Sequence, residues 1–337
     1  MAKEVELLNV VNKSIEIRFD KSSILALLGV TLLLTTLDER AYATSPLYAS
    51  VSHDHNGVPL VYYGTTFGWQ YNPITIAQDA MKHYSSFKKI GNQTDLALLK
   101  NESNWLVNNA EVKGNFSMLY YHFDFTRYNM SSPWRSGMAQ GQALQALTEA
   151  YQATGNKSYN NAARLLLSSL YLSEADGGVT SKTSGQGWWY EEYADENGSN
   201  PRVLNGMMYT LVAIHEYYNY TNDPSAKFLF DQGIVPLTIN LPQYDSVQNG
   251  SYYDALGKPA SDLYHRVHIT LLSQLYTITA DPVIKEYRDK WNTWYVEHKA
   301  TVTPEFASPL VVIISGVLAS IAFARRTRSF YTNSNGK

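Results

Sequence analysis

Cysteine is absent from the 337 residues, so neither a disulfide, nor a thiol nucleophile, nor a zinc–thiolate site can form. Charge is also sparse, with 17% charged residues and a formal net charge of −3, which gives no electrostatic footprint for nucleic acid as a partner. The 45% apolar content is enough for one globular core. Tyrosine, by contrast, is abundant with 26 residues, and that excess needs a role.

An apolar run near the start of the chain indicates export. Residues 24–37 are interrupted only by Gly and Thr, follow several basic residues, and precede the small residues of Ala41-Tyr42-Ala43 at the spacing of a signal-peptidase site. Residues 1–43 are therefore predicted to be a signal peptide or an N-terminal anchor, and both readings fit.

A second apolar run lies near the other end. Residues 306–324 carry no charge and are followed by Arg325, Arg326 and Arg328, so residues 304–337 are predicted to be a transmembrane or sorting segment with a basic cytoplasmic tail. Pro304-Glu305-Phe306 ahead of the run resembles the C-terminal sorting tails of some archaeal surface proteins. Both ends place the middle of the chain outside the cytoplasm, anchored to the membrane or cell surface.

Glycosylation acceptors agree with an exported protein. Nine Asn-X-Ser/Thr sequons occur, at Asn12, Asn92, Asn101, Asn115, Asn129, Asn156, Asn197, Asn219 and Asn249. Asn, Ser and Thr are also common in loops, so the sequons alone do not decide the matter.

Helical patterns between the ends come in pairs. The expected helices cover residues 74–87 and 95–109, 143–151 and 158–171, 206–220 and 224–239, and 267–279 and 282–296. Three junctions repeat the pattern Tyr-x-x-Thr before a tight Asn or Asp turn, at residues 151–154, 218–221 and 276–279. Repeated hairpins bury their apolar faces by stacking. We therefore expect a mainly α domain over residues 44–303, an α/α toroid or incomplete (α/α) barrel of paired helices with short β-hairpin insertions.

The long connections between the pairs hold the aromatic clusters. Residues 110–136, 172–204 and 240–266 emerge at the same end of stacked hairpins and contain residues 120–124, 188–193 and 252–264. The densest cluster is Trp188-Trp189-Tyr190-Glu191-Glu192-Tyr193, which combines flat rings with carboxylates and phenols. Phenols and a glutamate around one site indicate proton chemistry on a carbohydrate.

Several segments together resemble the D-glucuronyl C5-epimerase family in its C-terminal helical domain. They are residues 137–143, 189–193 and 203–206, Pro242 with Tyr244-Asp245, Tyr253-Asp254, and Tyr264-His265 with His268-Ile269, in the family's order over roughly residues 60–300. The resemblance implies cofactor-free inversion of C5 in D-glucuronic acid residues of a polysaccharide to give L-iduronic acid. It also implies catalytic roles for Glu192, Tyr193, Tyr253 and Tyr264.

This chemistry suits those side chains. The C5 proton beside a carboxylate is weakly acidic, so a site must stabilise an enediolate-like charge while groups on two faces remove and return the proton. Glutamate and tyrosine have ordinary pKa values far from neutrality, and burial must bring them into range.

Further residues are expected to bind the substrate. They are the aromatics Trp69, Tyr121, Trp189 and Tyr190, the cations Arg135, Lys258 and Arg266, and the polar residues Gln140, Asn205, His265 and His268. The two histidines lack a third ligand at a suitable spacing, so an orienting role is favoured and no metal site is predicted. Residues 137–143 and Asn205-Gly206 also suit close helix packing.

The chain departs from the family in two ways. The arginine that follows the family's Tyr-Asp-Leu motif is missing, because Tyr253-Asp254 continues as Ala255-Leu256-Gly257-Lys258; Lys258, Arg266, Arg202 and Arg135 are substitutes. The large N-terminal β-domain is also missing, so the walls of the substrate site are thinner or come from a partner chain, which allows a homodimer.

Three classes of function remain open. The first is an extracytoplasmic uronate C5-epimerase acting on a uronate-containing polysaccharide or surface glycan. The second is a polysaccharide lyase or a glycoside hydrolase on an α/α toroid; a hydrolase needs a pair of carboxylates, for which Glu191, Glu192, Asp245 and Asp254 are available. The third is a non-catalytic glycan-binding surface protein.

Overall fold

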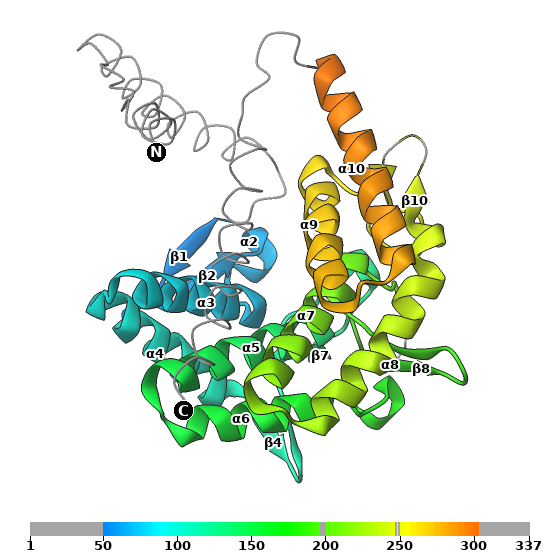
Figure 1. Ribbon diagram of the computed structural model, residues 1–337. Helices are drawn as coiled ribbons and strands as arrows, with labels where there is room; N and C mark the ends of the chain where they lie inside the picture. Colours follow the sequence, from blue (N-terminus) through cyan, green and yellow to red (C-terminus); the bar gives the residue numbers. More distant parts are fainter. Residues whose placement is uncertain (1–49, 196–199, 247, 249, 303–337) are drawn as a thin grey trace, which may run out of the picture. The chain divides into compact units, whose positions relative to one another are not determined.

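The computed structural model describes residues 50–195, 200–246, 248 and 250–302 (Figure 1). Both predicted terminal segments, residues 1–43 and 304–337, lie outside the described residues. Within the described part, no helix combines the length and the apolar character needed to cross a membrane.

The chain divides into two units, residues 1–52 with 61–70 and residues 53–60 with 71–337. The first contains the short helix α2 (Gly64–Phe67), and the rings of Tyr62 and Trp69 lie 5.3 Å apart in it. The strands β1 (Val51–His53), β2 (Pro59–Tyr62) and β3 (Trp69–Tyr71) fall where the units meet in sequence. Everything that follows concerns the second unit unless stated.

The long helices of the second unit form four antiparallel hairpins. Their bounds are α3 (Pro73–Ile90) with α4 (Gln93–Asn109), α5 (Gly137–Thr154) with α6 (Lys157–Ser169), α7 (Leu204–Thr221) with α8 (Pro224–Asn240), and α9 (Asp262–Thr279) with α10 (Pro282–Val302). All four predicted pairs are confirmed.

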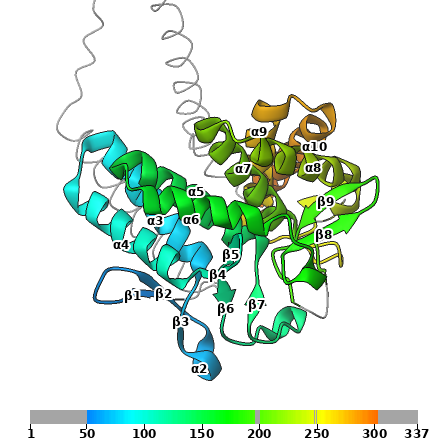
Figure 2. The same cartoon turned by 90° about the horizontal axis from the view of Figure 1, so that it is seen from below.

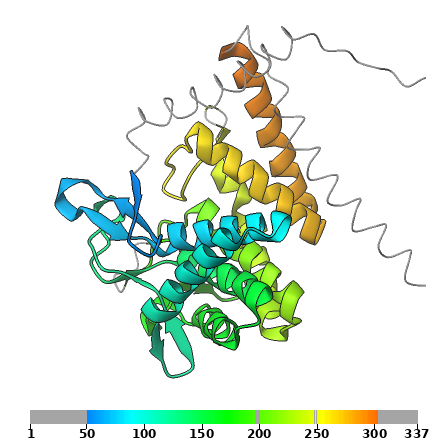
Figure 3. The same ribbon diagram turned by 90° about the vertical axis from the view of Figure 1, so that its left-hand side faces the viewer.

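The hairpins stack in chain order. The first helix of each pair packs against the first helix of the next, so that α3, α5, α7 and α9 form one row, and the second helix packs on the outside of its partner (Figures 1 and 2). Figure 3 shows the last pair, α9 and α10, beyond the other three. This is the predicted mainly α, incomplete α/α toroid. Residues 137–143 are all buried at the start of α5, as expected for close helix packing, and a Cβ at Gly141 would lie 2.9 Å from the Thr210 Cα.

The repeated Tyr-x-x-Thr pattern ends the first helix of three pairs. In each, the threonine Oγ1 donates to the carbonyl four residues earlier and accepts from the backbone N–H of the next helix's capping residue, at 3.2 Å in all three. The capping residues Asn156, Asp223 and Asp281 then accept from the first turn of the partner helix. The residue between them is left-handed in each case: Gly155, Asn222 and Ala280. The pattern therefore encodes the tight turn inside a hairpin.

Short β-hairpins fill the connections between the pairs, as predicted. They are β4 (Glu111–Lys113) with β5 (Phe116–Met118), β6 (Tyr120–Tyr121) with β7 (Trp134–Arg135), β8 (Thr180–Thr183) with β9 (Gly187–Tyr190), and β10 (Asp245–Ser246) with β11 (Gly250–Ser251). Each is antiparallel, and their registers pair Val112 with Ser117, Tyr121 with Trp134, Lys182 with Trp188, and Asp245 with Ser251. Three 3-10 turns lie beside them: η1 (Thr126–Tyr128), η2 (Glu174–Asp176) and η3 (Leu241–Tyr244).

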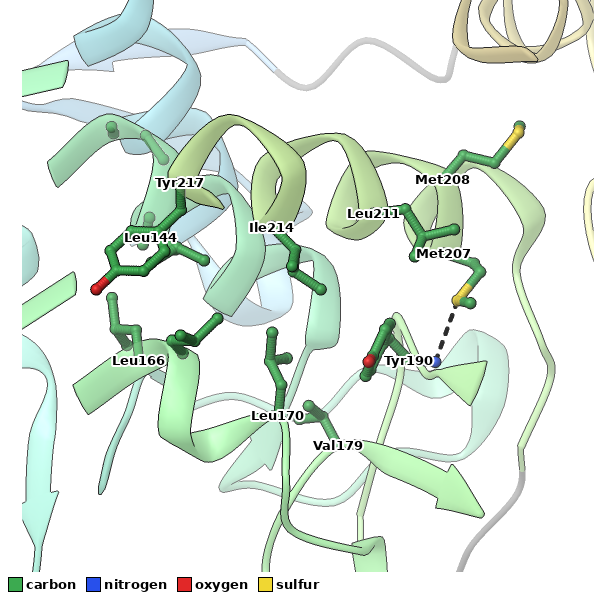
Figure 4. Close-up of a cluster of buried hydrophobic side chains, with 14 of the residues drawn as sticks. Leu144, Leu166, Leu170, Val179, Tyr190, Met207, Met208, Leu211, Ile214 and Tyr217 are labelled. Carbon is green, nitrogen blue, oxygen red and sulfur yellow. Dashed lines mark hydrogen bonds between the residues drawn. The ribbon is translucent and has the colours of Figure 1, made fainter. Parts of the chain in front are cut away.

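The core joins one of these hairpins to the helices. Figure 4 shows Tyr190 of β9 against Met207 and Leu211 of α7, near Val179. The Tyr190 backbone N–H donates to the Met207 sulfur at 3.2 Å, and its hydroxyl donates to the Leu229 carbonyl at 2.6 Å. These contacts fix β9, and with it the residues that follow.

Candidate active site

Glu192 lies two residues beyond β9, where two connections meet. A β-bridge between Arg135 and Ala194 ties this segment to β7, with N–H···O distances of 2.8 and 2.9 Å in the two directions. The Glu192 side chain packs on the start of α7, where a Cβ at Gly206 would lie 2.4 Å from Glu192 Oε2. Asn205 Nδ2 donates to the same oxygen at 3.4 Å. Glycine at 206 therefore makes room for the carboxyl, which answers why the Asn205-Gly206 pair opens this helix.

Glu192 is only 6% exposed, and its carboxyl is set for proton exchange. Burial raises its pKa to about 7, against the lowering effects of hydrogen bonds from the Tyr193 and Tyr253 side chains and of the Arg127 charge. A carboxyl with a pKa near neutrality can both accept and release a proton at working pH.

Three tyrosines share this environment. Tyr253 forms side-chain hydrogen bonds with Glu192, Tyr193 and Tyr264, and its ring lies 4.8 Å from that of Tyr264 in an edge-on arrangement. Burial, followed by the Glu192 charge, raises the pKa of all three phenols, so each stays protonated at neutral pH. The four residues predicted to be catalytic therefore lie together in the structure.

An aromatic wall holds Tyr193. Its ring stacks on Phe125 with centroids 5.2 Å apart and lies 5.6 Å from Trp134 and 4.7 Å from Tyr128. This wall comes from the connection between α4 and α5. The bridge to β7 thus brings Tyr193 against it.

Asp254 fixes the loop that carries Tyr253. Its Oδ1 accepts from the backbone N–H groups of Leu256 and Lys258, both at 3.1 Å, and its Oδ2 accepts from the Tyr128 hydroxyl at 2.7 Å. Tyr128 and Asp254 therefore join two of the long connections.

Two cations flank Tyr253. The Lys258 Nζ lies 5.7 Å and the Arg127 Cζ 6.0 Å from the Tyr253 ring centroid. Arg127 is exposed on η1, and its charge acts on Glu192, Tyr128 and Tyr264. Lys258 was among the expected cations, but Arg127 was not, because it lies on a short turn without any periodic pattern.

Several expected substrate contacts are instead enclosed by protein. Tyr190 is fully buried in the core, Trp189 is 1% exposed and stacks on Tyr244 at 5.9 Å, and Gln140 bonds the backbone of Leu119 on both its N–H and C=O. None of these three presents surface to a ligand in this structure. We therefore assign them to packing.

Arg135 and the two histidines are also enclosed. Arg135 donates to the carbonyls of Gly178 and Glu174 at 3.0 and 3.3 Å. His265 and His268 share the Ser251 hydroxyl at 2.8 and 2.9 Å, and both are buried. These contacts hold the helix and strand framework, so the orienting role expected for the histidines applies to β11 and not to the substrate directly.

The remaining expected residues divide differently. Asn205 and Lys258 lie at the Glu192 cluster. Tyr121 stacks on Trp134 at 3.9 Å and donates to Asn72 at 3.0 Å, while Arg266 is exposed on α9 with Asp262 3.8 Å away. Trp69, 45% exposed, belongs to the first unit, so its role at the site stays a prediction.

The other carboxylates considered for hydrolysis have partners elsewhere. Glu191 Oε2 accepts from the Arg202 backbone N–H at 3.0 Å. Asp245 accepts from Lys290 and Trp291 of α10, at 2.5 and 3.0 Å. Glu191 and Glu192 are neighbours in an extended segment, so their side chains point to opposite sides.

Comparison with known proteins connects this site to a family. The D-glucuronyl C5-epimerase C-terminus family matches residues 113–293, which include every residue of the Glu192 cluster. The chain belongs to this family. The match ends within α10.

Two relatives and one solved structure set the range of similarity. The uncharacterized protein MJ1128 of Methanocaldococcus jannaschii is 27% identical over 304 residues, covering 80% of this chain and 98% of its own length. The D-glucuronyl C5-epimerase of Caenorhabditis elegans is 32% identical over 210 residues, and the match covers 56% of this chain but only 33% of that enzyme. Cellobiose 2-epimerase from Bacillus thermoamylovorans aligns with a TM-score of 0.49 at 15% identity, covering 68% of this chain and 61% of its own.

Proposed function

We propose that this protein is a uronate C5-epimerase that converts D-glucuronic acid residues of a polysaccharide into L-iduronic acid. Family membership supports an epimerase. The observation that carries the finer proposal is one buried carboxyl, Glu192, with a pKa of about 7, hydrogen-bonded to two of three neighbouring protonated tyrosines. That set can take a proton from carbon and give one back.

Glu192 is the base of the proposed reaction. Above pH 7 its carboxylate is populated, and it accepts the C5 proton as the C5–H bond breaks and the electron pair moves into the substrate carboxylate. The resulting enediolate needs positive charge close by.

Arg127 and Lys258 supply that charge. Both lie about one side chain's reach from Tyr253, and Arg127 already acts electrostatically on Glu192 and Tyr264. A guanidinium can bind a carboxylate through two parallel hydrogen bonds. We therefore place the substrate carboxylate at Arg127, in the role of the arginine that is missing after Tyr253-Asp254.

Tyr264 is the acid on the opposite face, and Tyr253 resets the site. Delivery of the Tyr264 proton to C5 completes inversion and leaves a phenolate beside a protonated Glu192. Because the pKa of the Tyr264 phenol is raised, this state is unfavourable. Tyr253 hydrogen-bonds with both groups, so it can pass the proton from Glu192 back to Tyr264.

The carboxylates favour epimerisation over hydrolysis. A hydrolase needs a second carboxyl across the scissile bond. Glu191 and Asp245 are held by Arg202 and by α10, and Asp254 is held by Tyr128 and its own loop. A lyase shares the proton abstraction and differs only in expelling the 4-linked sugar.

Product analysis tests the proposal. The full chain incubated with a glucuronate polymer should produce iduronate while the chain length stays constant. An ultraviolet-absorbing unsaturated uronate would select the lyase, and new reducing ends without unsaturation would select the hydrolase. Binding without any reaction on uronate polymers would leave the glycan-binding protein.

The location is a separate proposal. The apolar runs and basic flanks at both termini, together with the sequons, support an extracytoplasmic domain held at the membrane or cell surface. Protease added to intact cells should digest residues 44–303, and complete protection of that region would contradict this location.

A further inference from the structure

A second cluster of ionisable side chains lies between α3 and α4. Asp79 and His83 are one turn apart on α3, and Glu102 faces them from α4. One ligand atom from each of these three lies within 4.8 Å of the other two. His53, which precedes the loop to β2, adds a second imidazole from the solvent side.

The distances suit a single metal ion. His83 Nε2 lies 3.6 Å from Asp79 Oδ2 and 3.7 Å from Glu102 Oε1, and His53 Nε2 lies 3.7 Å from the same Asp79 oxygen. Zinc binds nitrogen and oxygen at about 2.0–2.2 Å, so two ligand atoms on a tetrahedral ion lie roughly 3.3 Å apart. Small side-chain movements close the difference.

Glu102 is the observation that points to a ligand. Its side chain is completely buried, yet neither carboxylate oxygen has a hydrogen-bond partner among the described residues. A buried carboxyl without a partner is costly. Lys82, the nearest cation, lies 3.4 Å from the other oxygen of Asp79 and is mostly exposed.

His83 is oriented as a metal ligand would be. Its Nδ1 lies 2.7 Å from Asp95 Oδ1, and Asp95 Oδ2 accepts from the Ser86 hydroxyl at 2.5 Å. A carboxylate on one ring nitrogen leaves the other, Nε2, as the free electron pair directed at Asp79 and Glu102. Aspartate, histidine and metal in this order are a frequent arrangement at zinc sites.

We propose that His83, Asp79 and Glu102, with His53 as the fourth ligand, bind one Zn²⁺ ion that fastens α3 to α4. Two imidazoles and two carboxylates are a ligand set that zinc accepts, and the ion would neutralise three neighbouring carboxylates. The site is built from other residues than the Glu192 cluster. It is structural and belongs to the first helical hairpin.

Metal content is the direct test. Tag-free full chain, stripped with a chelator, loaded with Zn²⁺ and dialysed, should retain close to one zinc per chain by mass spectrometry. Its melting temperature should rise with the logarithm of free Zn²⁺. Retention well below one equivalent would overturn the proposal.

Three variants and a control separate metal binding from simple packing. Glu102→Gln and His83→Asn should lose zinc retention and the thermal shift, and Asp95→Asn, which keeps every ligand, should weaken zinc binding about 10- to 100-fold. His215→Asn, on α7, should behave as wild type.

Glu102→Gln also tests the metal-free alternative. Without an ion, burial and the Asp79 charge raise the pKa of Glu102 to about 9, so the carboxyl would hold a proton and glutamine would replace it at little cost. A folded Glu102→Gln chain that binds zinc as tightly as wild type would refute the site.

Discussion

Replacement of Glu192 by glutamine should remove activity while making the protein more stable at alkaline pH. The reason is the buried carboxyl itself. Burial moves its pKa from the ordinary 4.5 to about 7. The folded protein therefore holds a proton between these values that the unfolded chain has already released, and stability falls as pH rises through this window.

The size of the effect follows from the pKa. One pH unit corresponds to about 1.4 kcal/mol, so the span from 4.5 to about 7 gives about 3 kcal/mol, on an order-of-magnitude scale. This stabilising contribution is complete below pH 4.5 and is lost once the pH exceeds 7. Glutamine keeps the shape and stays neutral. The variant should match wild type near pH 4.5 and exceed it by up to about 3 kcal/mol at pH 8.5.

Denaturant unfolding of both proteins at several pH values measures this difference. All other titrating groups are common to the two chains, so they cancel in the comparison. Glu111→Gln is the matched control, because the Glu111 side chain is 50% exposed and pairs only at the surface with Lys113. If the Glu192→Gln and wild-type curves keep the same separation from pH 4.5 to 8.5, Glu192 does not titrate near neutrality and the base assignment is wrong.

Three further outcomes are expected. Tyr264→Phe should lower kcat by about 10²- to 10⁴-fold with an unchanged melting temperature, and a large loss of stability would instead indicate a packing role. Arg127→Met should lower kcat/KM about 10²-fold for uronate polymers, whereas Arg266→Met on the exposed side of α9 should not; equal effects would remove the carboxylate from Arg127. Ala280→Gly should stabilise the chain by about 1 kcal/mol in denaturant unfolding, because Ala280 has a φ of 53°, and Gly155→Ala at the equivalent turn should destabilise it similarly; opposite signs would contradict the shared turn geometry.

The helical framework was predictable because its punctuation is local. Asn or Asp caps and first-turn prolines mark where helices begin, and the Tyr-x-x-Thr repeat marks three of the turns inside the hairpins. These signals depend on residues within four positions of one another. The paired order then follows from chain connectivity.

Side-chain direction in the connections was less predictable. Trp189 and Tyr190 looked like sugar-stacking residues, but the hairpin pairing of β9 turns both into the protein, while Glu192 and Tyr193 lie just past the strand's end. Composition alone could not separate the two halves of that hexapeptide. Register against β8 and the bridge to Ala194 decide it.

Residues that depend on contacts between distant segments were missed. Arg127 reaches Tyr253 across 126 positions of sequence, through the bond between Tyr128 and Asp254. Asp79 and His83 have a visible one-turn spacing, but only the packing of α3 on α4 brings Glu102 to them. Neither arrangement leaves a pattern within one segment.

Deuterium exchange at C5 tests the central claim most directly. With a glucuronate polymer in heavy water, the wild-type chain should place solvent deuterium at C5 of the uronate residues and produce iduronate, as read by nuclear magnetic resonance. The folded Glu192→Gln chain should place almost none. Iduronate that retains the original C5 hydrogen, or equal exchange by the Glu192→Gln chain, would contradict the account.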